Sequence, residues 1–341
     1  RTRPFLRTTE FLWQEGHTAH ADEADARSET MQMLGIYRRF MEEWMAMPVY
    51  TGRKTAAERF AGAVDTYACE ALMKDNKALQ AGTSHYLGEN FARAFDVRFQ
   101  TVEGEHAFVH NTSWGVSTRL IGGLIMTHGD DTGLVLPPRL APIQAIIVPI
   151  WRNDEQQSSV LAAAREAEAD LLGTGVRVRV DDREGMNPGA KYYDWERKGV
   201  PLRLEIGPRD VESGSVMAVR RFTPDGDDRK RSIDRAALAT ELTAQLERMQ
   251  TELFTRALER RAANTTSGIE DYEQFKSIVE QRGGFVFTGW CGDAECEARV
   301  KDETKATIRV IVGDDLASHV PPVSCLCGEG SVMEVIRARA Y

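Results

Sequence analysis

The chain has 341 residues, a length that fits two or three domains better than one. Its 42% hydrophobic and 28% charged residues are ordinary for a globular protein and exclude a largely disordered chain. The formal net charge of -9 argues against a protein that coats nucleic acid non-specifically, although it allows a local basic site. No stretch approaches 18 uninterrupted apolar residues, so we expect no membrane span.

The start of the chain and its cysteines set two further expectations. Arg1 is not an initiator Met, no signal peptide follows it, and the chain begins inside an expected strand over residues 1–17. We therefore expect a fragment that lacks its true start. Five cysteines exclude a disulfide-rich secreted scaffold, and four of them lie from Cys291 onward. This usage predicts a reduced, cytoplasmic protein with one local metal site, and core packing for Cys69.

The first section predicts helices and short strands. An amphipathic helix is expected over residues 22–46, ended by Pro48, and a second helix over 55–74. Short strands are expected near 80–86, 95–102 and 107–113. Prolines around 134–142 indicate a boundary, which gives a first domain of residues 1–142.

The second section, residues 143–233, alternates strands and helices. Strands are expected at 145–150, 176–180, 202–206 and 215–222, helices at 155–172 and 190–198, and a loop at 224–231. This order predicts a compact α/β domain with a mixed sheet.

A long helix over residues 234–262 opens the last domain, residues 234–341. Its apolar positions step by three and four, which predicts a connector packed on its neighbours rather than a coiled coil. These positions are Leu238, Leu242, Leu246, Met249, Leu253 and Ala257.

The expected strand near the start presents an unusual set of side chains on one face. Alternation places a cation, two aromatic rings, a carboxylate and an imidazole together. A small-molecule site needs such apolar walls with a few charges, whereas ordinary surface pairing on an amphipathic strand is the alternative. The residues of this face are Arg7, Thr9, Phe11, Trp13, Glu15 and His17.

Residues 7–17, Arg-Thr-Thr-Glu-Phe-Leu-Trp-Gln-Glu-Gly-His, closely resemble the second half of motif 2 of class II aminoacyl-tRNA synthetases, specifically the prolyl-tRNA synthetases. The resemblance continues in chain order through residues 52–55, 82–88, 111–115, 119–138, 198–210 and the terminal cysteines. It implies an α/β and α+β multidomain fold: a partial catalytic domain with an antiparallel sheet, an α/β anticodon-binding domain, and a small C-terminal zinc-binding domain. The zinc-binding domain is typical of the eukaryotic- and archaeal-like branch of the family.

The resemblance implies an activity and its participants. Proline and ATP, with Mg²⁺, form prolyl-adenylate, which then acylates tRNA(Pro), in a homodimeric enzyme. The protein positions the reactants and stabilises charge on the phosphates. Arg7 and Arg119 match the catalytic arginines. The ATP contacts implied are Arg7, Phe11, Gln80, Thr83, Ser117 and Arg119. The proline contacts implied are Trp13, Glu15, Thr83, His85 and Trp114, with Glu15 accepting from the prolyl ammonium.

Several of these residues have simpler readings when they are taken alone. Residues 82–84 would form an ordinary turn, and His85 would be a hydrogen-bonded core residue. For His17 a structural hydrogen bond is favoured. Residues 52–55 (Gly-Arg-Lys-Thr) lack the upstream glycine of a P-loop, so that reading is rejected.

Arg119 lies between a polar segment, residues 111–118, and an apolar helix, residues 120–126. At such a junction a planar guanidinium meets phosphate while helix amides add positive potential. In the second domain the resemblance directs attention to Lys191, Glu196 and Lys198 as tRNA contacts, the lysines on phosphate and the glutamate on a base edge. A solvated charged helix is the alternative for these three.

The cysteines form a candidate metal site. Cys291, Cys296, Cys325 and Cys327 could supply four thiolates to one tetrahedral structural zinc, and Gly292 and Gly328 give the backbone room to turn. Reduced buried cysteines or a redox pair are the alternatives from spacing alone, and the resemblance favours zinc.

Two departures from the family pattern bear on activity. Motif 1 and the first half of motif 2 are not in this sequence, so the α-phosphate arginine and the dimer-forming segment are missing from it. Only 111 residues separate Arg7 from Arg119, which leaves no room for the editing domain of the bacterial-type branch. A non-catalytic tRNA-binding or interaction protein derived from a synthetase is the main alternative. A synthetase for threonine or glycine is a third.

The 341-residue chain by itself is therefore expected to be inactive, because positioning supplies most of the mechanism. Aminoacylation with proline, ATP and cognate tRNA measures this. Robust turnover by the isolated chain would contradict the expectation.

Overall fold

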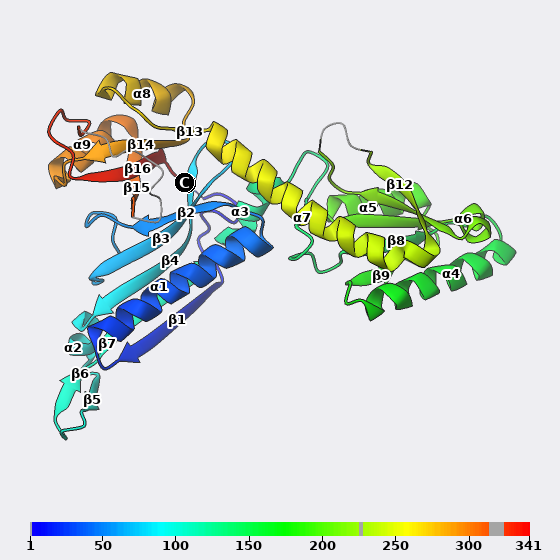
Figure 1. Ribbon diagram of the computed structural model, residues 1–341, viewed down its shortest axis with the longest axis horizontal. Helices are drawn as coiled ribbons and strands as arrows, with labels where there is room; N and C mark the ends of the chain where they lie inside the picture. Colours follow the sequence, from blue (N-terminus) through cyan, green and yellow to red (C-terminus); the bar gives the residue numbers. More distant parts are fainter. Residues whose placement is uncertain (1, 225–227, 314–323) are drawn as a thin grey trace. The chain divides into compact units, whose positions relative to one another are not determined.

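The computed structural model describes residues 2–224, 228–313 and 324–341 (Figure 1). Contacts divide the chain into two compact units. The first contains residues 1–42, 47–127 and 258–341, and the second contains residues 43–46 and 128–257. Within the described ranges, none of the helices combines the length and apolar character that crossing a bilayer requires.

The first unit is built on one nine-stranded sheet that joins strands from both ends of the chain (Figure 1). Neighbouring strands are antiparallel, except for the last pair, which is parallel. The expected antiparallel catalytic fold is therefore confirmed. In sheet order the strands are β1 (Trp13–His20), β7 (His110–Ser117), β4 (Ala78–Gly88), β3 (Asp65–Leu72), β2 (Val49–Arg53), β15 (Ala306–Ile311), β16 (Met333–Arg339), β14 (Phe285–Trp290) and β13 (Thr265–Thr266).

Helix α1 (Glu23–Arg39) packs against β4 and β7. The carboxylate of Asp22 caps it by accepting from the backbone N–H of Asp25, and acidic residues in the first turn complement the helix dipole. The helix continues as a π-helical turn, η1 (Phe40–Trp44). The expected helix over residues 22–46 is confirmed.

Two expectations for this unit are wrong. Residues 55–74 do not form a helix, because Asp65–Leu72 is strand β3 in the sheet interior. Most of β3 is buried, so the polar alternation that marks a half-exposed strand is absent from its sequence. The first strand does not begin at residue 1 but at Trp13, because Arg3 and Arg7 exchange backbone hydrogen bonds around a turn at Pro4.

Short elements complete the unit. The strands expected near 80–86 and 95–102 are confirmed as β4 and β5 (Arg98–Gln100). The run expected near 107–113 is divided between β6 (His106–Phe108), which pairs with β5 in a hairpin, and β7. The helices are α2 (Asn90–Phe95), α3 (Arg119–His128), α8 (Tyr272–Gln281) and α9 (Ala294–Thr304). Helices α8 and α9 cover one face of the C-terminal strands, while Phe285, Phe287 and Ile336 on the other face pack with Leu72 and Ala78.

The second unit contains a mixed five-stranded sheet, as expected. Strands β10 (Leu202–Ile206), β8 (Ala145–Pro149) and β9 (Val178–Val180) are parallel, and β11 (Ser215–Arg220) and β12 (Lys230–Asp234) extend the sheet in antiparallel fashion. The expected loop 224–231 lies partly outside the described residues, and β12 begins inside it. The helices are α4 (Asp154–Gly173), α5 (Pro188–Arg197), α6 (Pro208–Ser213), the short η2 (Arg235–Ala237) and α7 (Leu238–Ala263).

Helix α7 confirms the long connector helix. All six of its predicted apolar positions are buried. Leu238, Leu242, Leu246 and Met249 share a core with Val160 and other residues of α4 and the sheet. The helix is thus packed on its own chain, as the 3.6-residue pattern predicted.

Candidate functional site

A cavity of about 500 Å³ lies in the first unit, beside strands β1, β7 and β4. In the strand register Gly115 of β7 lies opposite both Glu15 of β1 and Thr83 of β4. Because Gly115 has no side chain, space remains between the carboxylate and the hydroxyl. Three segments far apart in the sequence therefore meet at one site.

Nine of the ten residues predicted for ATP or proline line this cavity. They are Phe11, Trp13, Glu15, Gln80, Thr83, His85, Trp114, Ser117 and Arg119. Arg7 is not among the lining residues; it is exposed at the end of the N-terminal turn. Its charge nevertheless contributes to lowering the pKa of Arg119, so it lies near the cavity.

Arg119 is the first residue of α3, as its place between a strand and a helix predicted. Its Nε donates to the carbonyl of Leu6 (3.2 Å) and its Nη1 to the carbonyl of Gln80 (3.3 Å). Burial lowers the pKa of Arg119, and the positive charge of Arg7 makes a smaller contribution in the same direction. The guanidinium thus rests on backbone carbonyls, which orient it without neutralising it, and an anion in the cavity would complete its coordination.

His85 forms a buried polar wall of the cavity. Its Nδ1 lies 2.9 Å from the hydroxyl of Thr66, and its ring centroid is 4.9 Å from that of Phe60. Burial lowers the pKa of His85 to about 4. The imidazole is therefore neutral at neutral pH and can both donate and accept hydrogen bonds without adding charge.

The aromatic residues occupy different positions. Phe11 and Trp13 contact each other edge to face, 5.3 Å between centroids, and both are exposed beside the cavity. Trp114 pairs with Gly16 in the register, and a Cβ on Gly16 would lie 2.3 Å from its ring. Gly16 is thus required for the indole to lie across β1.

His17 does not line the cavity. Its Nε2 lies 3.3 Å from the carboxylate of Glu15, and its side chain is largely exposed. This contact agrees with the structural role favoured from the sequence.

Sequence reasoning missed a third wall of the cavity, formed by Glu58, Arg59, Phe60 and Thr66. The incorrect helix over residues 55–74 concealed it. A useful signal was available, because Glu58, Arg59 and Phe60 lie within five residues of the Gly-Arg-Lys-Thr segment of the resemblance. Lys54 of that segment is buried and donates to Glu70, so it is not free to bind phosphate, which agrees with the rejection of a P-loop.

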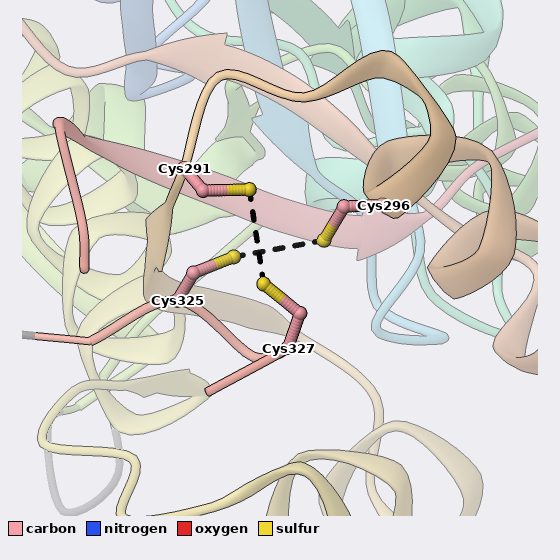
Figure 2. A group of neighbouring side chains, drawn as sticks. All are labelled: Cys291, Cys296, Cys325 and Cys327. Atoms are coloured by element: carbon pink, nitrogen blue, oxygen red, sulfur yellow. Dashed lines mark hydrogen bonds between the residues drawn. The ribbon is translucent and has the colours of Figure 1, made fainter. Parts of the chain in front are cut away.

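The four C-terminal cysteines converge as predicted (Figure 2). Their sulfur atoms all lie within 4.8 Å of one another, with 3.6 Å between Cys296 and Cys325 and 3.7 Å between Cys291 and Cys327. Gly292 and Gly328 have positive φ values of 84° and 92°, which favour glycine at these turns. The cluster could hold a metal ion.

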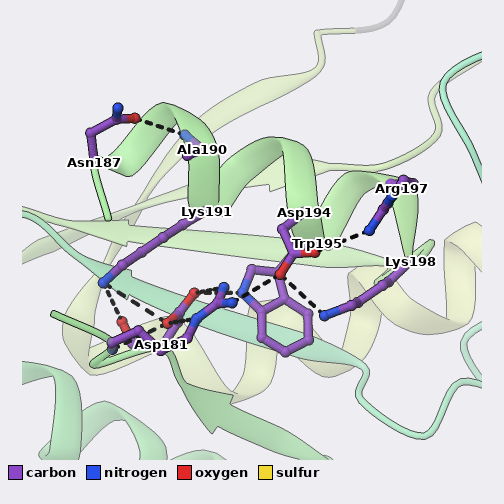
Figure 3. A network of polar contacts seen from close by, with 9 residues as sticks. Asp181, Asn187, Ala190, Lys191, Asp194, Trp195, Arg197 and Lys198 are labelled. Carbon is purple, nitrogen blue, oxygen red and sulfur yellow. Dashed lines mark hydrogen bonds and ion pairs between the residues drawn. The ribbon is translucent and has the colours of Figure 1, made fainter. Parts of the chain in front are cut away.

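In the second unit, helix α5 and the loop before it form a polar network around Asp181 (Figure 3). Trp195 donates to this carboxylate (2.7 Å) and Arg183 binds it with two nitrogens. Burial alone would raise the pKa of Asp181, but these hydrogen bonds hold the pKa at about 2. The carboxylate is thus a fixed charge that orders the loop.

The three residues predicted to contact tRNA lie in different surroundings. Lys191 is buried, and its Nζ donates to the carbonyl of Asp181 (2.9 Å). It lines a second cavity, of about 400 Å³, together with residues that the sequence did not single out, namely Trp151, Arg183 and Asn187. Glu196 accepts from Arg229, and Lys198 lies half exposed over the ring of Trp195.

Comparison with known proteins agrees with the geometry. The family model "tRNA synthetase class II core domain (G, H, P, S and T)" matches residues 1–128, "Anticodon binding domain" matches 144–245, and "Prolyl-tRNA synthetase, C-terminal" matches 272–341. A protein of Chlorobium phaeovibrioides named proline–tRNA ligase is 51% identical over all of this chain and 70% of its own length. Similarly named proteins of Symbiobacterium thermophilum and Salinibacter ruber are 51% and 50% identical, over 70% and 68% of their lengths.

The chain belongs to the prolyl-tRNA synthetase family. The resemblance seen in the sequence is thereby confirmed, as is its class II assignment. A synthetase for threonine or glycine is excluded, because the relatives and the C-terminal model both specify proline. The family assignment covers the whole chain, including the section with the four cysteines.

The low pKa of His85 predicts a pH-dependent stability. Its ordinary pKa is 6.5 and its folded value about 4, so between these values the unfolded chain binds a proton that the folded chain does not. The free energy of unfolding should therefore fall as the pH drops from 6.5 towards 4. The free energy of unfolding of the wild type minus that of His85→Gln should be roughly 2 kcal/mol lower at pH 5 than at pH 7, because only the wild type loses stability through this histidine.

Urea unfolding at both pH values measures this difference. His106→Gln is the matched control, since His106 is exposed on β6. An equal difference at both pH values would show that folded His85 titrates normally.

Proposed function

We propose that the protein ligates proline to tRNA(Pro) in two steps, through a prolyl-adenylate made from proline and ATP. The observation that carries the proposal is the convergence of Glu15, Thr83, His85 and Arg119 on one cavity. The names of the relatives support it, and so does the class II core match. A non-catalytic relic would have no need of this preserved set.

For the nucleotide, we assign the arginines to charge stabilisation. Arg119 projects from the N-terminus of α3, where the helix dipole adds to its positive potential. Arg7 adds a second positive charge from the N-terminal turn. Phe11 offers an exposed ring for stacking, while Gln80, Thr83 and Ser117 supply polar groups around the nucleotide. The bound ATP brings Mg²⁺, which offsets charge on its phosphates.

For proline, we assign Glu15 to the ammonium group. An ammonium in an enclosed site requires an acceptor, and the open space beside Gly115 lets the ligand reach the carboxylate. Trp13 provides an apolar wall, and neutral His85 with Thr83 provides hydrogen bonds. Trp114 borders the cavity on strand β7, but its indole lies at Gly16, on the face of the sheet opposite to Glu15 and Thr83. Neutrality of His85 suits this role, because a second cation would repel the prolyl ammonium.

For tRNA, we propose that Lys191, Glu196 and Lys198 contribute to anticodon binding. The anticodon-binding match supports the location. Lys198 is half exposed and paired with Asp194 (3.1 Å), so it would exchange this partner for a phosphate, whereas Lys191 acts from within the cavity wall. We further propose that the protein is a cytoplasmic homodimer. Each chain has three domains, residues 1–142, 143–233 and 234–341, a division supported by the three family matches.

For the cysteines, we propose one structural zinc. Tetrahedral zinc with Zn–S bonds of ~2.3 Å requires sulfur atoms about 3.8 Å apart. The separations of 3.6 and 3.7 Å fit this geometry. Four protein ligands would leave no open position on the ion, so its role would be to hold Cys291 and Cys296 to the later pair rather than to bind substrate.

Arg119→Ala is predicted to impair adenylate formation. Removing a charged donor from the developing phosphate charge should lower the rate by roughly 100-fold or more. Proline-dependent exchange of pyrophosphate into ATP, measured on the complete gene product, reports this step. Arg98→Ala on the exposed hairpin strand β5 is the control and should keep full activity. Unchanged exchange in Arg119→Ala would reject the assigned role.

Cys325→Ser is predicted to lose zinc and loosen the C-terminal section. Residues 285–341 form a small core that a metal would supplement. Wild type should contain one zinc per chain, and the variant should be cut faster by protease within residues 285–341. Cys69→Ala, in strand β3 away from the cluster, should keep its zinc. A metal-free wild type that is cut no more slowly than Cys325→Ser would disprove the site.

A further inference from the structure

A buried ion cluster joins the C-terminal section to the strands that carry the candidate site. Glu70 of β3 is fully buried, and Arg309 of β15 binds its carboxylate with two nitrogens, at 3.0 and 2.9 Å. Lys54 donates to the same carboxylate (2.9 Å) and to the carbonyl of Arg309 (2.7 Å). Two cations from different segments thus surround one carboxylate, and all three side chains are removed from solvent.

Two irregularities of the sheet place this cluster. Arg309 is the extra residue of a β-bulge in β15, between Ile308 and Val310. Glu70 lies opposite Gln80 beside a second bulge, where Ala81 is the extra residue of β4. Bulges re-aim side chains and are retained at sites where this matters. Here both bulges occur at the same ion cluster, and one of them borders the cavity.

Glu70 also lies close to the arginine of the nucleotide site. Arg119 donates to the carbonyl of Gln80, the residue that faces Glu70 in the register. Among the described residues, the hydrogen bonds of its guanidinium go to the backbone carbonyls of Leu6 and Gln80, while the charge of Glu70 is close enough to act on the pKa of Arg119 and raise it. A buried carboxylate without its own partners would compete for this guanidinium, because unpaired buried charge is costly.

We propose that Arg309 is a positioning residue for the nucleotide site. It holds the Glu70 carboxylate in an ion pair, so that Glu70 does not bind Arg119 and the guanidinium of Arg119 stays available for the phosphates of ATP. Lys54 has the same effect from the other side of the carboxylate. The C-terminal section thereby contributes to ATP binding without touching ATP. The inference rests on the proposed function, since it assigns Arg119 to phosphate.

The test compares three variants of the complete gene product with wild type. Arg309→Met should raise the KM for ATP about tenfold, the effect of one charge-assisted contact, while the KM for proline stays nearly unchanged. Arg309→Lys keeps the charge but makes fewer hydrogen bonds, so it should raise the KM for ATP by a smaller factor, about threefold. Adding Glu70→Gln to Arg309→Met removes the competing carboxylate and should restore the KM for ATP.

Two controls separate positioning from folding. Arg299→Met removes an exposed arginine of α9 from the same section and should change neither KM. Circular dichroism reports whether each variant is folded. If Arg309→Met does not fold, the KM for ATP of Arg309→Lys tests the inference. A purely structural role would lower the active fraction but leave the KM for ATP unchanged, or give a rise that Glu70→Gln does not reverse. Either result overturns the inference.

Equilibrium dialysis with ATP alone distinguishes this inference from the proposed function. If wild type shows no proline-dependent exchange but binds ATP, the proposed function fails, and ATP affinity across the same variants still tests Arg309. Weaker ATP binding in Arg309→Met, restored by Glu70→Gln, would support the inference. Equal affinities would refute it, and a wild type that does not bind ATP would refute both.

Discussion

The first unit depends on one buried carboxylate. Glu70 is inaccessible to solvent, and such a group is tolerated only if cations neutralise it and hydrogen bonds satisfy its oxygens. Lys54 and Arg309 do both. Burial by itself raises the pKa of Glu70, but the charges and hydrogen bonds of the two cations outweigh burial and hold the pKa below its ordinary value. Strand β15, which carries Arg309, pairs with β2, so the C-terminal section belongs to the same sheet and supplies one of the two cations that neutralise Glu70.

The strand register turns this sheet into a site. Antiparallel pairing of β1 and β4 with β7 places Glu15, Gly115 and Thr83 in one row. The glycine leaves the space, and the strands on either side supply the polar groups. Rigid strands hold such groups more accurately than loops, and accurate placement is what adenylate formation requires. The loop with Glu58, Arg59 and Phe60 then closes one side of the cavity.

The cysteine cluster is formed by turns of the backbone rather than by strand register. Its members come from two segments, one after β14 and in α9, the other before β16. Glycines with positive φ let each segment turn so that the sulfurs converge. The hydrophobic layer beneath the cluster, which includes Trp290, Ile308 and Val335, is small. A metal would therefore add cross-links where the core alone is limited.

The sequence by itself determined the family, nine of the residues around the cavity, the four cysteines and the buried face of α7, because each depends on a local pattern of residue types and spacing. The tertiary structure alone decided the rest. Residues 65–72 form a strand in the sheet interior. A strand that is mostly buried lacks the alternation of polar and apolar residues by which half-exposed strands are recognised in a sequence. The tertiary structure buried Lys191, which a charged helix would otherwise expose. It also paired Glu70 with Arg309, 239 residues later, and no local rule relates two side chains at that separation. Only the strand order and its bulges bring them together.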